Sequence, residues 1–142
     1  MSDDTRLSAC NCFATRRAAR TITRLYERHL SAAGLTSAQF SILALTDERG
    51  SETMSELARI LAMDRTTLLR AMKPMQRERL LGSRANVEDP RQLVFFLTAI
   101  GQRRLREALG LWQEAQREFE AQVGSERAAR LRRDLLSLGG TS

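Results

Sequence analysis

The chain has 142 residues, a length typical of one domain or of one subunit in a small oligomer. It carries 23 Lys and Arg residues against 17 Asp and Glu residues, and Lys73 is the only lysine. The formal net charge of +6 makes nucleic acid, or another anionic surface, the first class of partner to consider.

The same composition argues against several other classes of protein. No apolar run approaches the roughly 18 residues that span a bilayer, and the polar, acidic start of the chain lacks the apolar segment of a signal peptide. Cys10 and Cys12 are too few and too close together for a disulfide framework. We therefore expect a cytoplasmic protein with no membrane partner.

Motifs that carry enzyme chemistry are also missing from the sequence. His29 is the only histidine, and there is no glycine-rich phosphate loop, GxSxG elbow, HExxH or paired CxxC. A metal site built from Cys10, Cys12 and His29 would have only three candidate ligands, fewer than a structural zinc site needs. The sequence predicts a protein that is not an enzyme, with no cofactor and no metal.

Helix punctuation recurs along the chain. The first helix shows an apolar period through Ala18, Ile22 and Leu25. Capping boxes at 36–39 and 53–56 predict the starts of the second and third helices. Further N-caps are expected at Asp64, Thr98 and Ser125. C-terminal glycine caps are expected at Gly34, Gly50 and Gly124.

One stretch, 80–98, departs from the helical period. The run 92–97 is apolar and rich in strand formers, and the turn residues 86–90 precede it, which is typical of a β-hairpin. The predicted order is therefore four helices, a hairpin and two helices. This is a mainly α fold with a small β-wing.

Helix 53–61, a tight turn around 62–63 and helix 64–78 match the helix-turn-helix arrangement. If the apolar positions of helix 64–78 face the core, its hydroxyls and cations point outward, where they can lie in a major groove. From Arg65 to Arg91 there are seven basic and three acidic residues. An outer basic face is often only a solvated surface, but the preceding capped helix and the basic hairpin favour DNA binding.

Several short motifs then point to a family. The stretches 34–40, 55–58, 63–68, 89–91 and 97–101 occur in the same order as in the MarR family of winged-helix transcriptional regulators, which the chain resembles from about residue 12 to 101. The resemblance implies a homodimerisation bundle made of 1–34 and 99–142. It also implies a winged helix-turn-helix DNA-binding lobe made of 35–98.

The resemblance also implies site residues. Recognition helix 64–78 and wing 82–97 would bind double-stranded DNA through basic and hydroxyl side chains. The resemblance implies Arg65, Thr66, Thr67, Arg70 and Arg91, and the basic residues of the outward helix face and the wing add Lys73, Arg77 and Arg84. Asp64 and Asp89 are expected to brace the wing.

Three positions depart from the family pattern. Arg79 stands where the family usually has a glycine, so the exit from helix 64–78 is expected to differ. Pro74 lies inside that helix and is expected to bend it. The wing lacks the second arginine that often follows the Asp-x-Arg pair, because Gln92 and Leu93 come next.

Two signals for release from DNA are open. Cys12-Phe13-Ala14 resembles the peroxide-sensing, OhrR-like branch, and a helix N-terminus near Arg16 would stabilise a thiolate at Cys10 or Cys12. Tyr26 matches one thiolate-holding tyrosine of that branch, but other residues replace two more. The thiols are equally explained as small packed side chains, and a bridge between them looks strained.

The second signal is a small aromatic ligand. The candidate pocket residues are Ile22, Tyr26, Phe40, Leu43 and Trp112, each of which is also a plausible core residue. The predicted function is a dimeric transcriptional regulator, a repressor, that binds a pseudo-palindromic operator and is released by such a ligand or by oxidation. The alternative is a dimeric helical protein-interaction module that has no specific DNA target.

Overall fold

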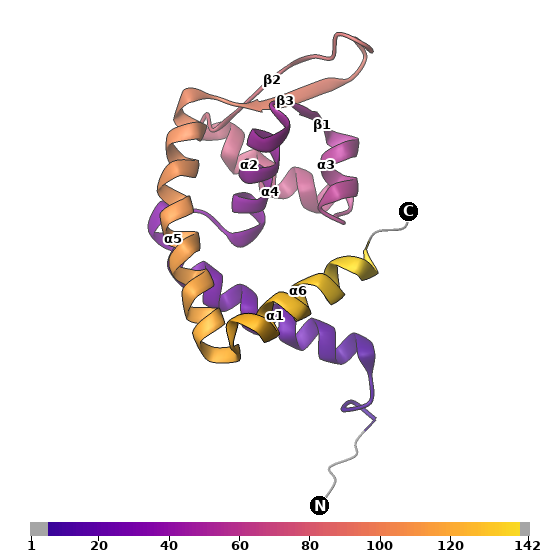
Figure 1. Cartoon of the computed structure of the whole chain (residues 1–142). Coiled ribbons are helices and arrows are strands. Elements are labelled where there is room, and N and C mark those ends of the chain that lie inside the picture. Colours follow the sequence, from indigo (N-terminus) through magenta and orange to yellow (C-terminus); the bar gives the residue numbers. More distant parts are fainter. Residues whose placement is uncertain (1–5, 140–142) are drawn as a thin grey trace, which may run out of the picture.

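The computed structural model describes residues 6–139, and it confirms the mainly helical fold with a small wing (Figure 1). The elements follow in the order α1 (Asn11–Leu30), the 3-10 turn η1 (Ser31–Ala33), α2 (Ser37–Arg49), β1 (Glu52–Thr53), α3 (Met54–Ile60), α4 (Arg65–Arg77), β2 (Leu81–Ala85), β3 (Leu93–Leu97), α5 (Ala99–Val123) and α6 (Ser125–Leu138). In the described part of the chain no helix is long and apolar enough to cross a membrane.

The main core lies in the lobe formed by α2, α3, α4 and the sheet. Leu68, Met72 and Met75, which recur at helical spacing on α4, are almost completely buried, as the sequence predicts. They pack in one cluster with Ile42 and Leu43 of α2. Because this face of α4 is fixed in the core, the opposite face is turned to solvent.

The sheet has three antiparallel strands in the order β1-β3-β2. The predicted hairpin is confirmed, with Leu81 opposite Leu97 and Ala85 opposite Leu93. The short strand β1 was not predicted: Glu52 pairs with Phe95 and Thr53 with Val94. A segment of two residues is too short to show an alternating hydrophobic pattern. It is a strand only because it pairs with β3, which is distant in the sequence.

Most of the predicted helix caps are confirmed. Thr36 forms the complete capping box with Gln39. Thr53 accepts the backbone N–H of Glu56, but the Glu56 carboxylate pairs with Arg59 instead of closing the box. The prediction for Ser125 is wrong by one residue, because α6 begins at Ser125 and its N-cap is Gly124.

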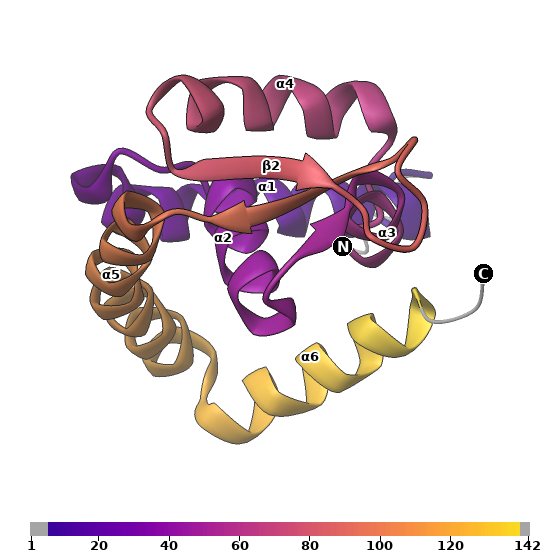
Figure 2. The same cartoon turned by 90° about the horizontal axis from the view of Figure 1, so that it is seen from above.

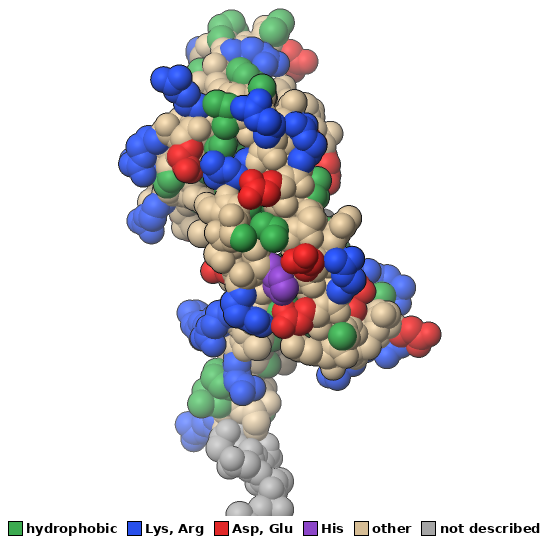
Figure 3. Space-filling view, turned by 90° about the vertical axis from the view of Figure 1, so that its left-hand side faces the viewer, with side chains coloured by type: hydrophobic (Ala, Val, Ile, Leu, Met, Phe, Trp, Pro, Cys, Tyr) green, Lys and Arg blue, Asp and Glu red, His purple; other side chains and the backbone are tan. Residues whose placement is uncertain are grey.

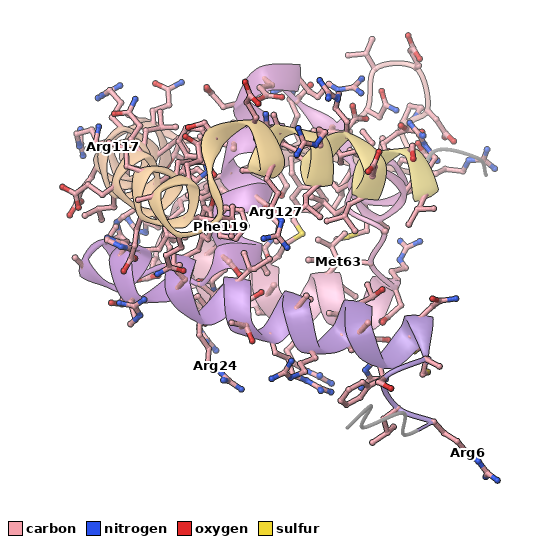
Figure 4. All side chains as sticks on the ribbon, turned by 60° about the horizontal axis from the view of Figure 1, so that its bottom comes forward. Arg6, Arg24, Met63, Arg117, Phe119 and Arg127 are labelled. Atoms are coloured by element: carbon pink, nitrogen blue, oxygen red, sulfur yellow. The ribbon has the colours of Figure 1, made fainter. Side chains whose placement is uncertain are left out.

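The two ends of the chain pack outside this lobe. The long α5 leaves the wing and runs down to α1, against which it packs extensively, and α6 turns back across α1 (Figures 1 and 4). Near the middle of α5, Trp112 stacks on Phe40 of α2 with ring centroids 6.2 Å apart. The contact joins α5 to the core of the lobe.

A tight junction joins α4, the sheet and α5. The Thr98 backbone N–H donates to the Leu80 carbonyl oxygen at 3.1 Å, and the Thr98 hydroxyl accepts from the Gly101 N–H at 3.0 Å. A Cβ atom at position 101 would lie 2.1 Å from that same Leu80 oxygen. Only glycine fits here without moving the backbone.

We predict that Gly101→Ala lowers the free energy of unfolding by about 1–3 kcal/mol, because the new methyl group overpacks against the Leu80 carbonyl. Urea unfolding followed by circular dichroism measures the change. Gly110→Ala is the matched control on the same helix, since a Cβ there meets no atom within 4 Å. It should raise stability by up to about 1 kcal/mol. Equal effects of both changes would contradict the junction.

Candidate nucleic-acid interface

Helices α3 and α4 form the predicted helix-turn-helix. α3 ends at Ile60 with Leu61 as its C-cap, and Ala62 takes a left-handed conformation with φ of 52°. The Met63 N–H then returns to the Ala58 carbonyl at 3.0 Å. This closed turn sets α4 at a fixed angle to α3, with Asp64 as its N-cap.

Asp64 caps the recognition helix rather than bracing the wing. Its carboxylate accepts the Thr67 N–H at 2.8 Å and the Thr67 hydroxyl at 2.7 Å. These bonds, the backbone one first, hold the pKa of Asp64 below its ordinary value. Within residues 6–139 Asp64 has no ion-pair partner. The prediction that it braces the wing is therefore wrong: its carboxylate is used by its own helix.

The outward face of α4 carries the predicted DNA-contacting side chains. All six predicted α4 residues are exposed, and they are Arg65, Thr66, Thr67, Arg70, Lys73 and Arg77. Figure 2 shows α4 running beside β2 along the edge of the lobe. Thr67 is less available than the others, because its hydroxyl already donates to Asp64.

The wing holds two further predicted residues. Arg91 donates to the Asp89 carboxylate through its backbone N–H at 3.2 Å and through Nε at 3.1 Å, so Asp89 fixes the shape of this loop. The Arg91 side chain is nevertheless 90% exposed. Arg84 on β2 lies over the Phe96 ring at 5.0 Å, which directs its guanidinium along the hairpin.

The helix and the wing both line a hollow of about 490 Å³. Arg65 of α4 and Arg91 of the wing line it, together with Leu69 and Gln76. A second, smaller hollow is lined by Thr66, Leu69, Arg70 and Lys73. Arg77 lies in the last turn, roughly 18 Å along the helix axis from Arg65, so it belongs to the other end of this surface.

Leu69 and Gln76 are residues of this surface that the sequence reasoning missed. The sequence signal for Leu69 is its position one turn from Thr66 and from Lys73, which places it on the polar face of the helix. Leu68 is completely buried, whereas Leu69 is 39% exposed.

The structure shows what happens at Arg79 and Pro74, the two positions near the end of α4 that depart from the family pattern. Arg79 takes the left-handed conformation, with φ of 62°, that a glycine would adopt at this position. Its carbonyl accepts the Thr98 hydroxyl. The chain therefore makes a left-handed turn here despite the arginine. α4 continues through Pro74 to Arg77.

The five predicted ligand-pocket residues do not line one pocket. Phe40 and Leu43 belong to the hydrophobic core, and Trp112 packs against it and stacks on Phe40. Ile22 and Tyr26 line a groove along α1, α5 and α6 that the other three residues do not line, although Tyr26 also packs against the core. The five residues are thus divided between the core and this groove, and a ligand site formed by them stays a prediction.

The groove along α1, α5 and α6 has a volume of about 500 Å³ and a largely apolar lining. Figure 4 shows Phe119 of α5 lying between α1 and α6, on one wall of this groove. At its inner end the Tyr26 hydroxyl donates to Gln116. Burial, followed by the nearby Glu120 carboxylate, raises the pKa of Tyr26 above its ordinary value.

The two cysteines lie at the start of α1 and are both free thiols. The Cys10 sulfur is the N-cap and accepts the Phe13 N–H at 3.4 Å. Cys12 is exposed. Tyr26 lies about 21 Å along α1 from Cys12, so it does not hold either thiol within one chain.

The only histidine belongs to an ion-pair cluster between α1 and α5. His29 Nε2 lies 2.8 Å from the Glu118 carboxylate, and Nδ1 lies 3.7 Å from Glu114. Figure 3 shows this histidine among acidic side chains. The hydrogen bond from His29 is the main cause of the lowered pKa of Glu118. Among residues 6–139 no three His, Cys, Asp or Glu side chains are grouped to hold a metal ion.

Known structures place this arrangement among winged helix-turn-helix DNA-binding proteins. The chain is 42% identical to the transcriptional regulator MosR of M. tuberculosis, solved in complex with DNA, with a TM-score of 0.80 over 92% of this chain and 93% of that chain. No family model and no curated protein matches the sequence.

Two more distant structures share the fold. A mutant MarR from E. coli, complexed with operator DNA, is 22% identical with a TM-score of 0.79 over 88% of this chain and 90% of that chain. Bordetella bronchiseptica BpsR, described with regulation of DNA binding by 6-hydroxynicotinic acid, is 17% identical with a TM-score of 0.84 over 95% and 96%. The chain belongs to the MarR family of transcriptional regulators, a family of regulators rather than enzymes.

Proposed function

We propose that the chain is a homodimeric repressor that binds a pseudo-palindromic operator through the recognition helix and the wing. The observation that carries the proposal is the hollow shared by α4 and the wing, which Arg65 and Arg91 both line. The charged side chains that line this hollow and its smaller neighbour are all basic among the described residues. A polyanion is the partner that fits such a surface.

In the proposed complex each element enters one groove of the DNA. An α-helix fits the major groove, and Arg70 on the outward face of α4 suits a bidentate contact to guanine. Arg91, at the base of the wing loop, reaches toward the neighbouring minor groove. Residues 35–98 thus serve as the DNA-binding lobe. We place the protein in the cytoplasm, where it has access to the chromosome.

The groove along α1, α5 and α6 supports dimerisation. Leu131, Leu135 and Leu136 of α6 line it, and they are 38%, 51% and 72% exposed, respectively. An apolar surface of this kind is typical of a protein interface. We infer that a second copy covers it, with 1–34 and 99–142 of both chains forming the bundle.

We predict that Arg91→Ala weakens binding to the operator and lowers the slope of log affinity against log salt by about one, because one phosphate contact is lost. Arg70→Ala should cost about 1–3 kcal/mol if this arginine reads a base. Gel shifts on the upstream DNA of the protein's own gene, over a range of salt concentrations, measure both. An equal loss on every sequence would make Arg70 a phosphate contact only.

Arg117→Ala is the control for these two variants, because Arg117 is an exposed arginine on α5 that points away from the lobe (Figure 4). It should leave the affinity and the salt slope unchanged. If wild-type protein shows no sequence-dependent shift at all, the alternative of a helical protein-interaction module without a DNA target is favoured.

Leu135→Glu tests the dimer. A carboxylate on this apolar surface would lose its water when a second copy covers it, so we expect the variant to sediment as a monomer and to lose affinity for a two-half-site operator. Leu93→Glu is the matched control for oligomeric state, because Leu93 is 53% exposed and lies outside the groove. A dimeric Leu135→Glu variant would contradict the assigned interface.

Release from DNA is proposed to follow oxidation at the start of α1. In this step a hydroperoxide transfers one oxygen to a cysteine thiolate, which becomes a sulfenic acid while water or an alcohol leaves. Two observations support it: Cys12 is exposed, and the Cys10 sulfur interacts with the N-terminus of α1. α1 also lines the proposed dimer groove, so a change at its start can reach the interface. A small aromatic ligand is the second candidate signal.

We predict that hydroperoxide abolishes the gel shift of the wild-type protein and that Cys12→Ser or Cys10→Ser protects it. Reduction with a thiol should restore binding to the oxidised wild-type protein, because a sulfenic acid or a disulfide is reversible. The double serine variant is the control for other oxidised residues. Equal loss in all variants would exclude these thiols and direct attention to ligands.

A further inference from the structure

Leu69 is an exposed apolar side chain in the middle of the basic face of α4. Its neighbour Leu68 is completely buried, whereas Leu69 is 39% exposed. It is one helical turn from Thr66 and one turn from Lys73, so these side chains share one stripe along the helix. The stripe is otherwise polar, and part of the leucine side chain is left uncovered by the core.

The surroundings of Leu69 indicate what covers it. Leu69 lines both hollows of the interface: the larger one with Arg65 and Arg91, and the smaller one with Arg70 and Lys73. It thus forms the ridge between them. The groove in which an apolar partner would dock lies elsewhere, along α1, α5 and α6, and Leu69 is not part of its lining.

A leucine placed between cations on a DNA-facing helix can make only an apolar contact with a base. Its side chain neither donates nor accepts a hydrogen bond. At the base edges of the major groove the only apolar feature is the C5-methyl group of thymine. Contact between the two removes apolar surface of both from water.

We propose that Leu69 packs against a thymine methyl group and specifies thymine at one position of each half-site. The proposal rests on the proposed function, since α4 must lie in the major groove. Arg70 and Lys73 then fix the register of the helix through polar contacts, and Leu69 reads a feature that hydrogen bonds do not distinguish.

The test replaces thymine by deoxyuridine, which keeps the hydrogen-bonding edge and lacks only the methyl group. The probe is the duplex of highest affinity that the full-length protein selects from a random-sequence pool. Each thymine of this duplex is replaced singly, and the dissociation constants are measured by fluorescence anisotropy for wild type, Leu69→Ala and Leu69→Met.

For the wild type we expect one thymine per half-site at which deoxyuridine weakens binding about threefold to fivefold, the effect of one methyl group. Leu69→Ala should lose this discrimination at that position only, and Leu69→Met, which keeps an apolar side chain of similar volume, should retain it. Leu109→Ala is the control, since Leu109 is 38% exposed on α5. It should keep the wild-type profile.

Two results overturn the proposal, and they differ from failure of the proposed function. If no thymine in the selected duplex is sensitive in the wild type, or if Leu69→Ala keeps the wild-type profile, Leu69 does not read a methyl group although the protein binds specific DNA. If the selection enriches no sequence, the proposed function itself is wrong, and the proposal for Leu69 that rests on it is wrong as well.

Discussion

The backbone contact between Leu80 and the start of α5 is the constraint on which the rest of the structure depends. The Leu80 carbonyl oxygen accepts from Thr98, and Gly101 lies against it too closely for any side chain. Arg79, in a left-handed conformation, gives its carbonyl to the Thr98 hydroxyl. The end of α4, both strands of the wing and the first turn of α5 are therefore fixed to one another at a single point.

This junction links the two halves of the proposed mechanism. On one side it fixes the wing relative to α4, so that Arg65 and Arg91 line one hollow. On the other side it fixes α5, which extends to α1 and carries the wall of the apolar groove. The stack of Phe40 on Trp112 adds a second tie between α5 and the lobe. In the proposed mechanism, a signal at α1 must alter the spacing of two recognition helices, and these contacts connect α1 through α5 to the lobe that carries α4.

Much of this arrangement could be predicted from the sequence because its signals are local. Caps such as Thr36, and the apolar period through Leu68 and Met72, lie within a few residues of the structure they determine. Non-local features were missed: β1 exists only through pairing with β3, and Phe40 and Trp112 stack on each other. Asp64 was misassigned because an N-cap and an ion-pair partner have the same residue type. The candidate DNA face was identified by its charge, and for that reason its uncharged member, Leu69, was overlooked.

The central claim is that the bundle of the dimer holds two α4 helices, each with its wing, at a fixed separation on the DNA. Hydroxyl-radical footprinting of the dimer on its selected operator tests it most directly. We expect two protected half-sites whose centres are about one helical turn apart, roughly 34–36 Å, each flanked by minor-groove protection from a wing. A single protected half-site, or protection whose spacing varies from one selected duplex to another, would contradict it.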